Sequence, residues 1–181
     1  MFYLCLTYLR MILLLLLLIH LIQYTEAKRR IRWDCFDCQM DGSFSDQIEC
    51  RVGGSRHSLL NVELNLLSEL EQIKVYINIS TKFKSTITFR KFFDINFNGC
   101  RVISDMVQGT MVSNMFNAVV KSSNQPRKCP IQKVNFVFHN ISIEDALPMF
   151  VPTAQLFIQV NFYSRRQLYL NVSVMGEILE K

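Results

Sequence analysis

The sequence is poor in the residues that most catalytic and metal sites require. It has three histidines, and it contains no Gly-x-Ser-x-Gly elbow, no His-Glu-x-x-His pair and no glycine-rich phosphate loop. His57 lies next to Gly53 and Gly54, and His139 precedes a glycosylation sequon, so neither has the neighbours of a catalytic base or a zinc ligand. We therefore expect a protein that is not an enzyme and that uses no metal or cofactor.

Charged residues are also sparse, at 19% of the chain, and the excess of basic residues is concentrated in residues 28–32. Lys28, Arg29, Arg30 and Arg32 account for most of the formal net charge of +5, and the other lysines and arginines are scattered. This distribution does not favour a nucleic-acid partner, which requires basic residues along one face. We expect the basic run to be a solvated, mobile tail, although it also fits a processing protease specific for basic residues.

The only long hydrophobic run lies at the N-terminus. Residues 11–19 are apolar, Arg10 precedes them, and a polar stretch ending in Ala27 follows. Positive charge, a short apolar core and a small residue at a cleavage point are the three parts of a secretory signal.

The alternative is a retained membrane anchor, because residues 2–24 are long enough to span a bilayer if Arg10 and His20 are tolerated. A spanning helix needs about 20 predominantly apolar residues, and the uninterrupted stretch here has about half that number. We therefore expect residues 1–27 to be a cleaved signal peptide. Residues 28–181 contain no linker or internal repeat, and we expect them to form a single secreted, extracellular domain.

The mature region has an odd number of cysteines, namely Cys35, Cys38, Cys50, Cys100 and Cys129. Cysteines in an oxidising compartment are expected to pair, so one thiol must be left over or bonded to another chain. The Cys35-x-x-Cys38 spacing lacks the second pair of ligands that a zinc site requires. Structural disulfides are the better interpretation.

Alternation of apolar and polar residues predicts β-strands, and it can be checked against three Asn-x-Ser sequons, at Asn78, Asn140 and Asn171. In the strand predicted over 73–79 and in that over 168–174, the sequon asparagines fall on the polar face, where a glycan would reach solvent. Further strands are predicted over 47–52, 60–66, 86–97, 134–138 and 156–162, with a turn at Arg165 and Arg166.

One segment has a different period. Between residues 102 and 120 the apolar side chains recur every three or four positions, which predicts an amphipathic helix weakened in its middle by Gly109. Cys100 and Cys129 flank this helix, and a bond between them would close it onto the sheet. Many short strands with one-sided alternation predict an all-β fold, a sandwich of two antiparallel sheets carrying one helical insertion.

The order of these features resembles a known family. The aromatic stretch 86–97 ends near Cys100, a helix follows, and then come Ser123-Asn124, Cys129-Pro130 and a proline-containing loop over 147–152. This order is similar to that of an uncharacterised insect family of secreted proteins related to the ML lipid-recognition superfamily, and to CheB-like proteins of contact chemoreception. The resemblance implies an immunoglobulin-like sandwich whose sheets splay apart to hold a lipid or another hydrophobic molecule, and no catalytic chemistry.

The resemblance also implies a disulfide pairing, because the Cys38 segment fits the first cysteine of the family better than Cys35 does. Cys38 would then pair with Cys50, and Cys100 with Cys129, which leaves Cys35 for a disulfide-linked dimer or a transient bond with Cys38. The sequence departs from the family at four positions, each of which bears on ligand identity: Asn98 for an acidic residue, Arg127 for a histidine, Ala154 for a glycine and Leu156 for a tyrosine.

A hydrophobic carrier needs more inward apolar side chains than its sheets can pack. The candidates for lining such a cavity are Leu64, Leu66, Val75, Ile77, Phe89, Phe97, Met111, Met115, Phe136, Phe138, Ile158, Val160, Leu170 and Val172. The same side chains could equally form a close-packed core. The second interpretation is thus a protein-interaction module or receptor cofactor with a filled core. One of the adjacent Phe92 and Phe93 must face outward, as must Phe157, and such outward aromatics would suit either a pocket mouth or a protein contact.

Overall fold

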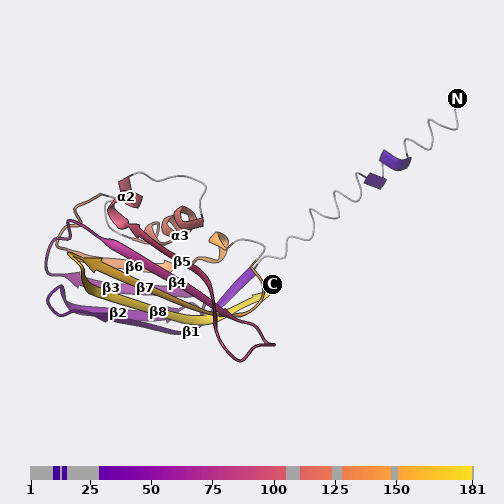
Figure 1. Ribbon diagram of the computed structural model, residues 1–181, viewed down its shortest axis with the longest axis horizontal. Coiled ribbons are helices and arrows are strands. Elements are labelled where there is room, and N and C mark those ends of the chain that lie inside the picture. The colour runs from indigo at the N-terminus through magenta and orange to yellow at the C-terminus, as the bar shows by residue number, and fades with distance from the viewer. Residues whose placement is uncertain are drawn as a thin grey trace.

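The computed structural model describes residues 10–12, 14–15, 29–104, 111–123, 128–147 and 151–180 (Figure 1). Most of the predicted signal peptide, including its cleavage point at Ala27, lies outside these residues. Among the residues that are described, no helix combines the length and the apolar character needed to cross a membrane.

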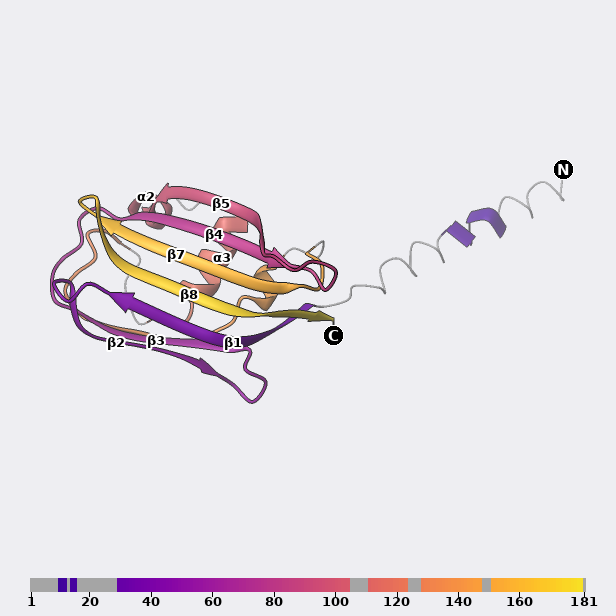
Figure 2. The ribbon, with the colours of Figure 1, turned by 60° about the horizontal axis from the view of Figure 1, so that its bottom comes forward.

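Two antiparallel sheets face each other, as Figures 1 and 2 show. The larger sheet has the order β1-β8-β7-β4-β5, and the smaller has the order β2-β3-β6. The strands are β1 (Arg29–Met40), β2 (Ser45–Gly53), β3 (Leu59–Leu66), β4 (Lys74–Lys82), β5 (Arg90–Asn98), β6 (Asn135–Ile141), β7 (Gln155–Ser164) and β8 (Gln167–Glu180). The predicted all-β sandwich is confirmed.

The predicted helical insertion consists of two helices, α2 (Gly99–Ser104) and α3 (Met111–Val120). Residues 105–110, with Gly109 and the expected weak point, lie outside the described residues. A short 3-10 helix, η1 (Glu144–Ala146), follows β6. The segment after α3 is held to β6, because the amide of His139 donates a hydrogen bond to the carbonyl of Ser122 at 3.0 Å. In this way α3 extends the layer formed by the smaller sheet.

The arginines of the basic run, from Arg29 onward, do not form a mobile tail, contrary to the expectation from their charge. Residues from Arg29 onward form β1, an edge strand of the larger sheet, in which Ile31 and Trp33 are 2% and 1% exposed. Arg29 and Arg32 form ion pairs with glutamates of the neighbouring strand β8. Burial of two large side chains outweighs the solvation of the arginines: the Arg32 side chain stays half-exposed, whereas that of Arg29 is only 17% exposed.

The register of β8 also differs from the predicted alternation at one end. Phe162 pairs with Leu170 and Tyr163 pairs with Leu168, so Tyr169 has no partner across the ladder. This bulge reverses the two faces: Tyr169 is buried against the Phe44 and Phe162 rings, whereas Leu168, expected to point inward, is exposed. Burial raises the pKa of the Tyr169 hydroxyl above its usual range.

The turn predicted at Arg165 and Arg166 is confirmed as a two-residue hairpin loop between β7 and β8. Both arginines have positive φ, 48° and 71°, as a type I′ turn requires. The strand predicted over 86–97, by contrast, begins only at Arg90, and residues 83–89 form the loop between β4 and β5.

The two disulfides tie the sheets together at opposite edges. Cys38 of β1 is bonded to Cys50 of β2, with 6.0 Å between their Cα atoms, and Cys100 of α2 is bonded to Cys129, which precedes β6. The pairing implied by the family resemblance is therefore confirmed. Cys35 is free and exposed.

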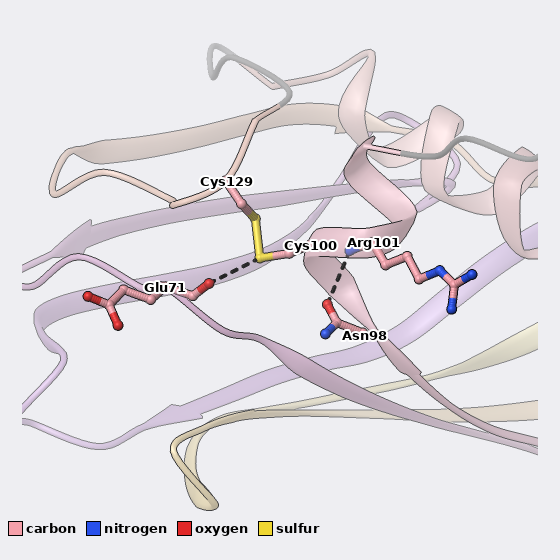
Figure 3. The surroundings of a disulfide bond; sticks show 5 residues. All are labelled: Glu71, Asn98, Cys100, Arg101 and Cys129. Atoms are coloured by element: carbon pink, nitrogen blue, oxygen red, sulfur yellow. Dashed lines mark hydrogen bonds between the residues drawn. A yellow bond between two sulfur atoms is a disulfide. The ribbon is translucent and has the colours of Figure 1, made fainter.

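The second disulfide is attached to β5 through the start of α2 (Figure 3). The Asn98 side-chain oxygen accepts a hydrogen bond from the Arg101 amide at 3.1 Å, which is the arrangement of a helix N-cap. Aspartate and asparagine cap helices about equally well. The asparagine at this position therefore performs locally what an acidic residue would, and it fixes the turn that directs Cys100 toward Cys129.

We predict that Gly176→Ala destabilises the protein by about 1 to 3 kcal/mol, the usual cost of overpacking a core. A Cβ atom at Gly176 would lie 2.8 Å from Cε3 of Trp33 and would also collide with the backbone carbonyl of Arg32. Urea unfolding measures the change. Gly42→Ala is the control, because nothing lies within 4 Å of its Cβ position; equal unfolding midpoints for the two variants would contradict the role of Gly176.

We predict that removing either disulfide destabilises the fold, and that the loss grows with the logarithm of the length of the loop that the disulfide closes. Replacing Cys100 and Cys129, separated by 29 residues, should cost about 3.5 kcal/mol, and replacing Cys38 and Cys50, separated by 12, about 3 kcal/mol. Peptide mapping without reduction should recover both links and a free Cys35. Recovery of a link between Cys35 and Cys50 would show that the pairing is wrong.

Candidate functional site

The two sheets differ in width, so three strands cannot cover the whole inner face of five. The remaining part of that face is covered by α3 (Figure 2) and by Leu147 and Val151, which follow η1 in the sequence. A narrow gap remains beneath this cover, and we call it the α3 gap. Its lining is Ile79, Thr81, Phe92, Met115, Leu147, Val151, Leu156, Ile158 and Ile178.

The floor of the α3 gap is formed by regular alternation in three adjacent strands. Ile79 and Thr81 of β4, Leu156 and Ile158 of β7, and Ile178 of β8 all point to the inner face and are buried. Of the lining residues that the structure describes, Thr81 alone has a hydroxyl. The floor is thus a rigid apolar surface held by the hydrogen bonds of the sheet.

Phe92 reaches the gap through a bulge in β5. Phe93 pairs with Ile79 and Lys91 pairs with Ser80, so Phe92 is the extra residue between them. Its side chain is 44% exposed while it also contributes to the lining. Phe92 therefore stands at the mouth of the gap.

The cover is less tightly integrated than the floor. Met115, Ala118 and Val119 of α3 are half-buried and pack against the core. The neighbouring η1 is anchored to β1, because the side chain of Glu144 accepts a hydrogen bond from the Ile31 amide at 2.9 Å. A helix carries its backbone hydrogen bonds within itself, so α3 can shift without breaking a sheet ladder.

The α3 gap is small, with a volume of about 20 Å³. Sites for small molecules usually enclose about 300 to 1,000 Å³, and about 10 to 15 Å³ is enough only for one water molecule. A lipid could therefore enter only if the cover moved away from the floor.

Two of the predicted cavity residues, Met115 and Ile158, line this gap. Most of the others belong to a second region of core between the sheets, where they pack closely: Leu64, Leu66, Val75, Ile77, Phe97, Phe136, Phe138, Val160, Leu170 and Val172. The side chain of Met111 lies outside the described residues. The predicted list did not include the other seven lining residues. Ile79, Thr81, Leu156 and Ile178 lie on regular strands, Phe92 lies at a bulge, and Leu147 and Val151 come from a loop and carry no periodic signal.

Phe89 does not point into the core, because it precedes β5 rather than lying in it. It is 38% exposed and makes an edge-to-face contact with Phe157, with 6.2 Å between the ring centroids. Phe157 lies on the outer face of the larger sheet, as the polar register of its strand predicted, and its partner across the ladder is the exposed Met175. These residues form an apolar strip outside the sandwich.

The three sequons differ in their surroundings. Asn78 and Asn171 are half-buried on the outer face of the larger sheet, and their side chains hydrogen-bond with Ser80 and Asn161. Asn140 is exposed near the end of β6 and has a positive φ of 58°. All three side chains lie outside the core, as glycan attachment requires.

The outer face of the smaller sheet holds a shallow polar depression of about 310 Å³, lined by Gln47, Glu63, Leu64, Asn65 and Asn135. The side chain of Glu63 accepts hydrogen bonds from His139 and Arg51. The His139 bond is the main cause that lowers the pKa of Glu63. Within the described ranges, no group of three or more His, Cys, Asp or Glu side chains is arranged to hold a metal ion.

A search of the curated proteins found no match to the chain. A comparison with family models did find one, which covers β4, β5, α2, α3, β6, η1 and the first part of β7. The matched segment contains every residue of the α3 gap lining except Ile178. Residues 73–158 of this chain thus match a family described as "Protein of unknown function (DUF1091)".

Proposed function

We propose that this chain is a secreted, non-enzymatic binding protein for a lipid or another small hydrophobic molecule, which it holds between α3 and the larger sheet. The observation that carries the proposal is the composition of the α3 gap: eight apolar side chains and one threonine, beneath a helix rather than a strand. Pockets for hydrophobic ligands have this character, with many apolar groups and few polar ones.

The disulfides support opening at α3 rather than between the sheets. Cys38–Cys50 holds the β1 edge, and Cys100–Cys129 holds the β5 edge, so parting the sheets would strain both bonds. Displacing α3 instead costs the contacts of Met115, Ala118 and Val119, and a bound apolar molecule would replace those contacts. Methionine adapts readily to ligands of different shape.

The lining favours a ligand that is mainly hydrocarbon. Among the described residues, no charged side chain lines the α3 gap, and Thr81 offers one hydroxyl for a hydrogen bond. The resemblance to insect proteins of contact chemoreception favours a chemosensory or pheromone ligand, and a membrane receptor as the partner that receives it. The presence of Leu156 where that family has a tyrosine leaves room in the floor for an apolar group.

Secretion is part of the same proposal. The signal-like residues 1–27, the two disulfides and the three sequons outside the core all fit an oxidising route to the cell exterior. Recovery of the protein from the culture medium, starting at Lys28 and losing mass on treatment with an N-glycosidase, would support this part. Retention in the membrane fraction with the N-terminus intact would contradict it.

The direct experiment extracts the purified native protein with organic solvent and identifies the released small molecules by mass spectrometry. A reproducible lipid or hydrocarbon at about one molecule per chain is expected. The same compound, made fluorescent, then serves as a probe of affinity.

We predict that Phe92→Ser weakens binding of this probe by about tenfold, because a phenyl ring at the mouth would be partly buried by the ligand. Leu168→Ser is the matched control: Leu168 is 43% exposed, close to the 44% of Phe92, and it lies at the opposite end of the sandwich. Urea unfolding checks that both variants fold. Equal affinities for the two variants would exclude the α3 gap as the binding site.

The second candidate is a protein-interaction module or receptor cofactor without a small ligand. The small volume of the α3 gap favours it, because about 20 Å³ is what a filled core leaves. Absence of any extracted molecule, together with a tight protein partner, would favour this candidate. A disulfide-linked dimer through the exposed Cys35 stays a prediction for either function, and electrophoresis without reduction checks it.

A further inference from the structure

We propose that the loop between β4 and β5 docks the protein on an anionic lipid bilayer. We call residues 82–92 the β4–β5 hairpin; Figure 1 shows its loop projecting from the body of the sandwich. The inference deepens the proposed function and rests on it for its purpose, because docking here would bring the mouth of the α3 gap to a bilayer that can supply or receive a hydrophobic ligand.

The tip of the hairpin is apolar and extends into solvent. Ile87 is 92% exposed, more than any other large apolar side chain in the described part of the chain, and Phe89 is 38% exposed. The loop is nevertheless ordered by a turn, because both the amide and the hydroxyl of Thr86 donate hydrogen bonds to the carbonyl of Phe83. A preformed turn that presents an aliphatic side chain can insert it into the acyl boundary of a bilayer without an ordering cost.

Basic residues surround this apolar tip. Lys82, Lys84, Arg90 and Lys91 lie within the hairpin, and the sequence contains no acidic residue between Glu71 and Asp94. Lys84 and Arg90 are exposed. Lys82 lies over the ring of Phe89, with its Nζ atom 6.0 Å from the centroid, so positive charge and apolar surface are directly adjacent. Lys91 pairs with Asp94 and contributes less.

The apolar surface continues from the hairpin onto the outer face of the larger sheet. Phe89 contacts Phe157, and Phe157 is paired across the ladder with Met175, which is 41% exposed. A lipid surface would cover this strip and the tip together. Buried apolar area and attraction to anionic headgroups are the two terms that determine interfacial binding.

The combination of basic residues and an exposed aliphatic side chain favours an anionic bilayer over a nucleic acid as the partner. A nucleic acid would pair with the four basic residues but leave Ile87 in water, whereas a bilayer accepts the aliphatic tip beneath the phosphates that meet Lys84 and Arg90. The hairpin also connects the strands that carry Thr81 and Phe92, both of which line the α3 gap. Docking by the hairpin therefore orients the mouth of the gap toward the membrane.

The test measures sedimentation of the full-length native protein with vesicles of phosphatidylcholine and phosphatidylserine in equal amounts, and with vesicles of phosphatidylcholine alone. We expect binding to the anionic vesicles that weakens as salt is added. Ile87→Asp should weaken binding by at least about tenfold. The pair Lys84→Glu and Arg90→Glu should weaken it further, by about fivefold for each basic residue removed.

Matched controls lie at the opposite end of the sandwich. The pair Arg165→Glu and Arg166→Glu makes the same change in net charge at an exposed turn, and Leu168→Asp places the same carboxylate on another exposed aliphatic position. Both should bind as the native protein does. If the control pair lost as much vesicle binding as the hairpin pair, the effect would be due to net charge alone, and the proposal would be wrong. It would also be wrong if Ile87→Asp bound the anionic vesicles as tightly as the native protein does.

Measuring the extracted ligand on the same proteins separates this proposal from the proposed function. Hairpin variants that retain ligand but no longer bind vesicles would support docking as a distinct property. If the native protein binds vesicles but carries no ligand, the docking proposal stands, whereas its role in ligand transfer is contradicted. A further outcome is that the protein binds soluble polyglutamate as tightly as vesicles, and that Ile87→Asp does not change this binding. That result would indicate an acidic protein partner and contradict the proposal of a bilayer.

Discussion

The covalent closure of both sandwich edges determines how the rest of this molecule is arranged. Cys38–Cys50 joins β1 to β2, and Cys100–Cys129 joins the end of β5 to the chain before β6, so the spacing of the sheets is set at each side. Side chains must then fill the interior without further adjustment of that spacing. With five strands on one side and three on the other, strands alone cannot do so, and α3 occupies the remaining place.

The two halves of the interior consequently differ in character. Near β1, Trp33 packs directly over Gly176, where even one added carbon atom would collide, and this half has no freedom to open. Beneath α3, the floor is equally rigid, but the cover consists of half-buried side chains on a helix that belongs to neither sheet. Any capacity to bind a ligand must reside in this second half.

Strand positions followed from the sequence because alternation with period two directly reflects one-sided burial, as in β3 and β7. The errors occurred where another constraint dominated. The arginines of β1 masked the alternation of Ile31 and Trp33, and a bulge exchanged the faces of Leu168 and Tyr169. The α3 gap was only partly predictable, because its lining combines the inner face of three strands with a helix face, a bulge and a loop, which share no single period.

The bulge in β5 joins the candidate site to the hairpin beyond it. Phe93 faces inward opposite Ile79, so strict alternation would direct Lys91 inward as well, into the apolar gap. An unpaired ammonium group there would carry a large desolvation cost. The extra residue, Phe92, instead places Lys91 opposite Ser80 on the outer face, where it pairs with Asp94. One inserted residue therefore keeps the gap apolar, puts an aromatic ring at its mouth, and leaves the Lys91 ammonium group on the outer face.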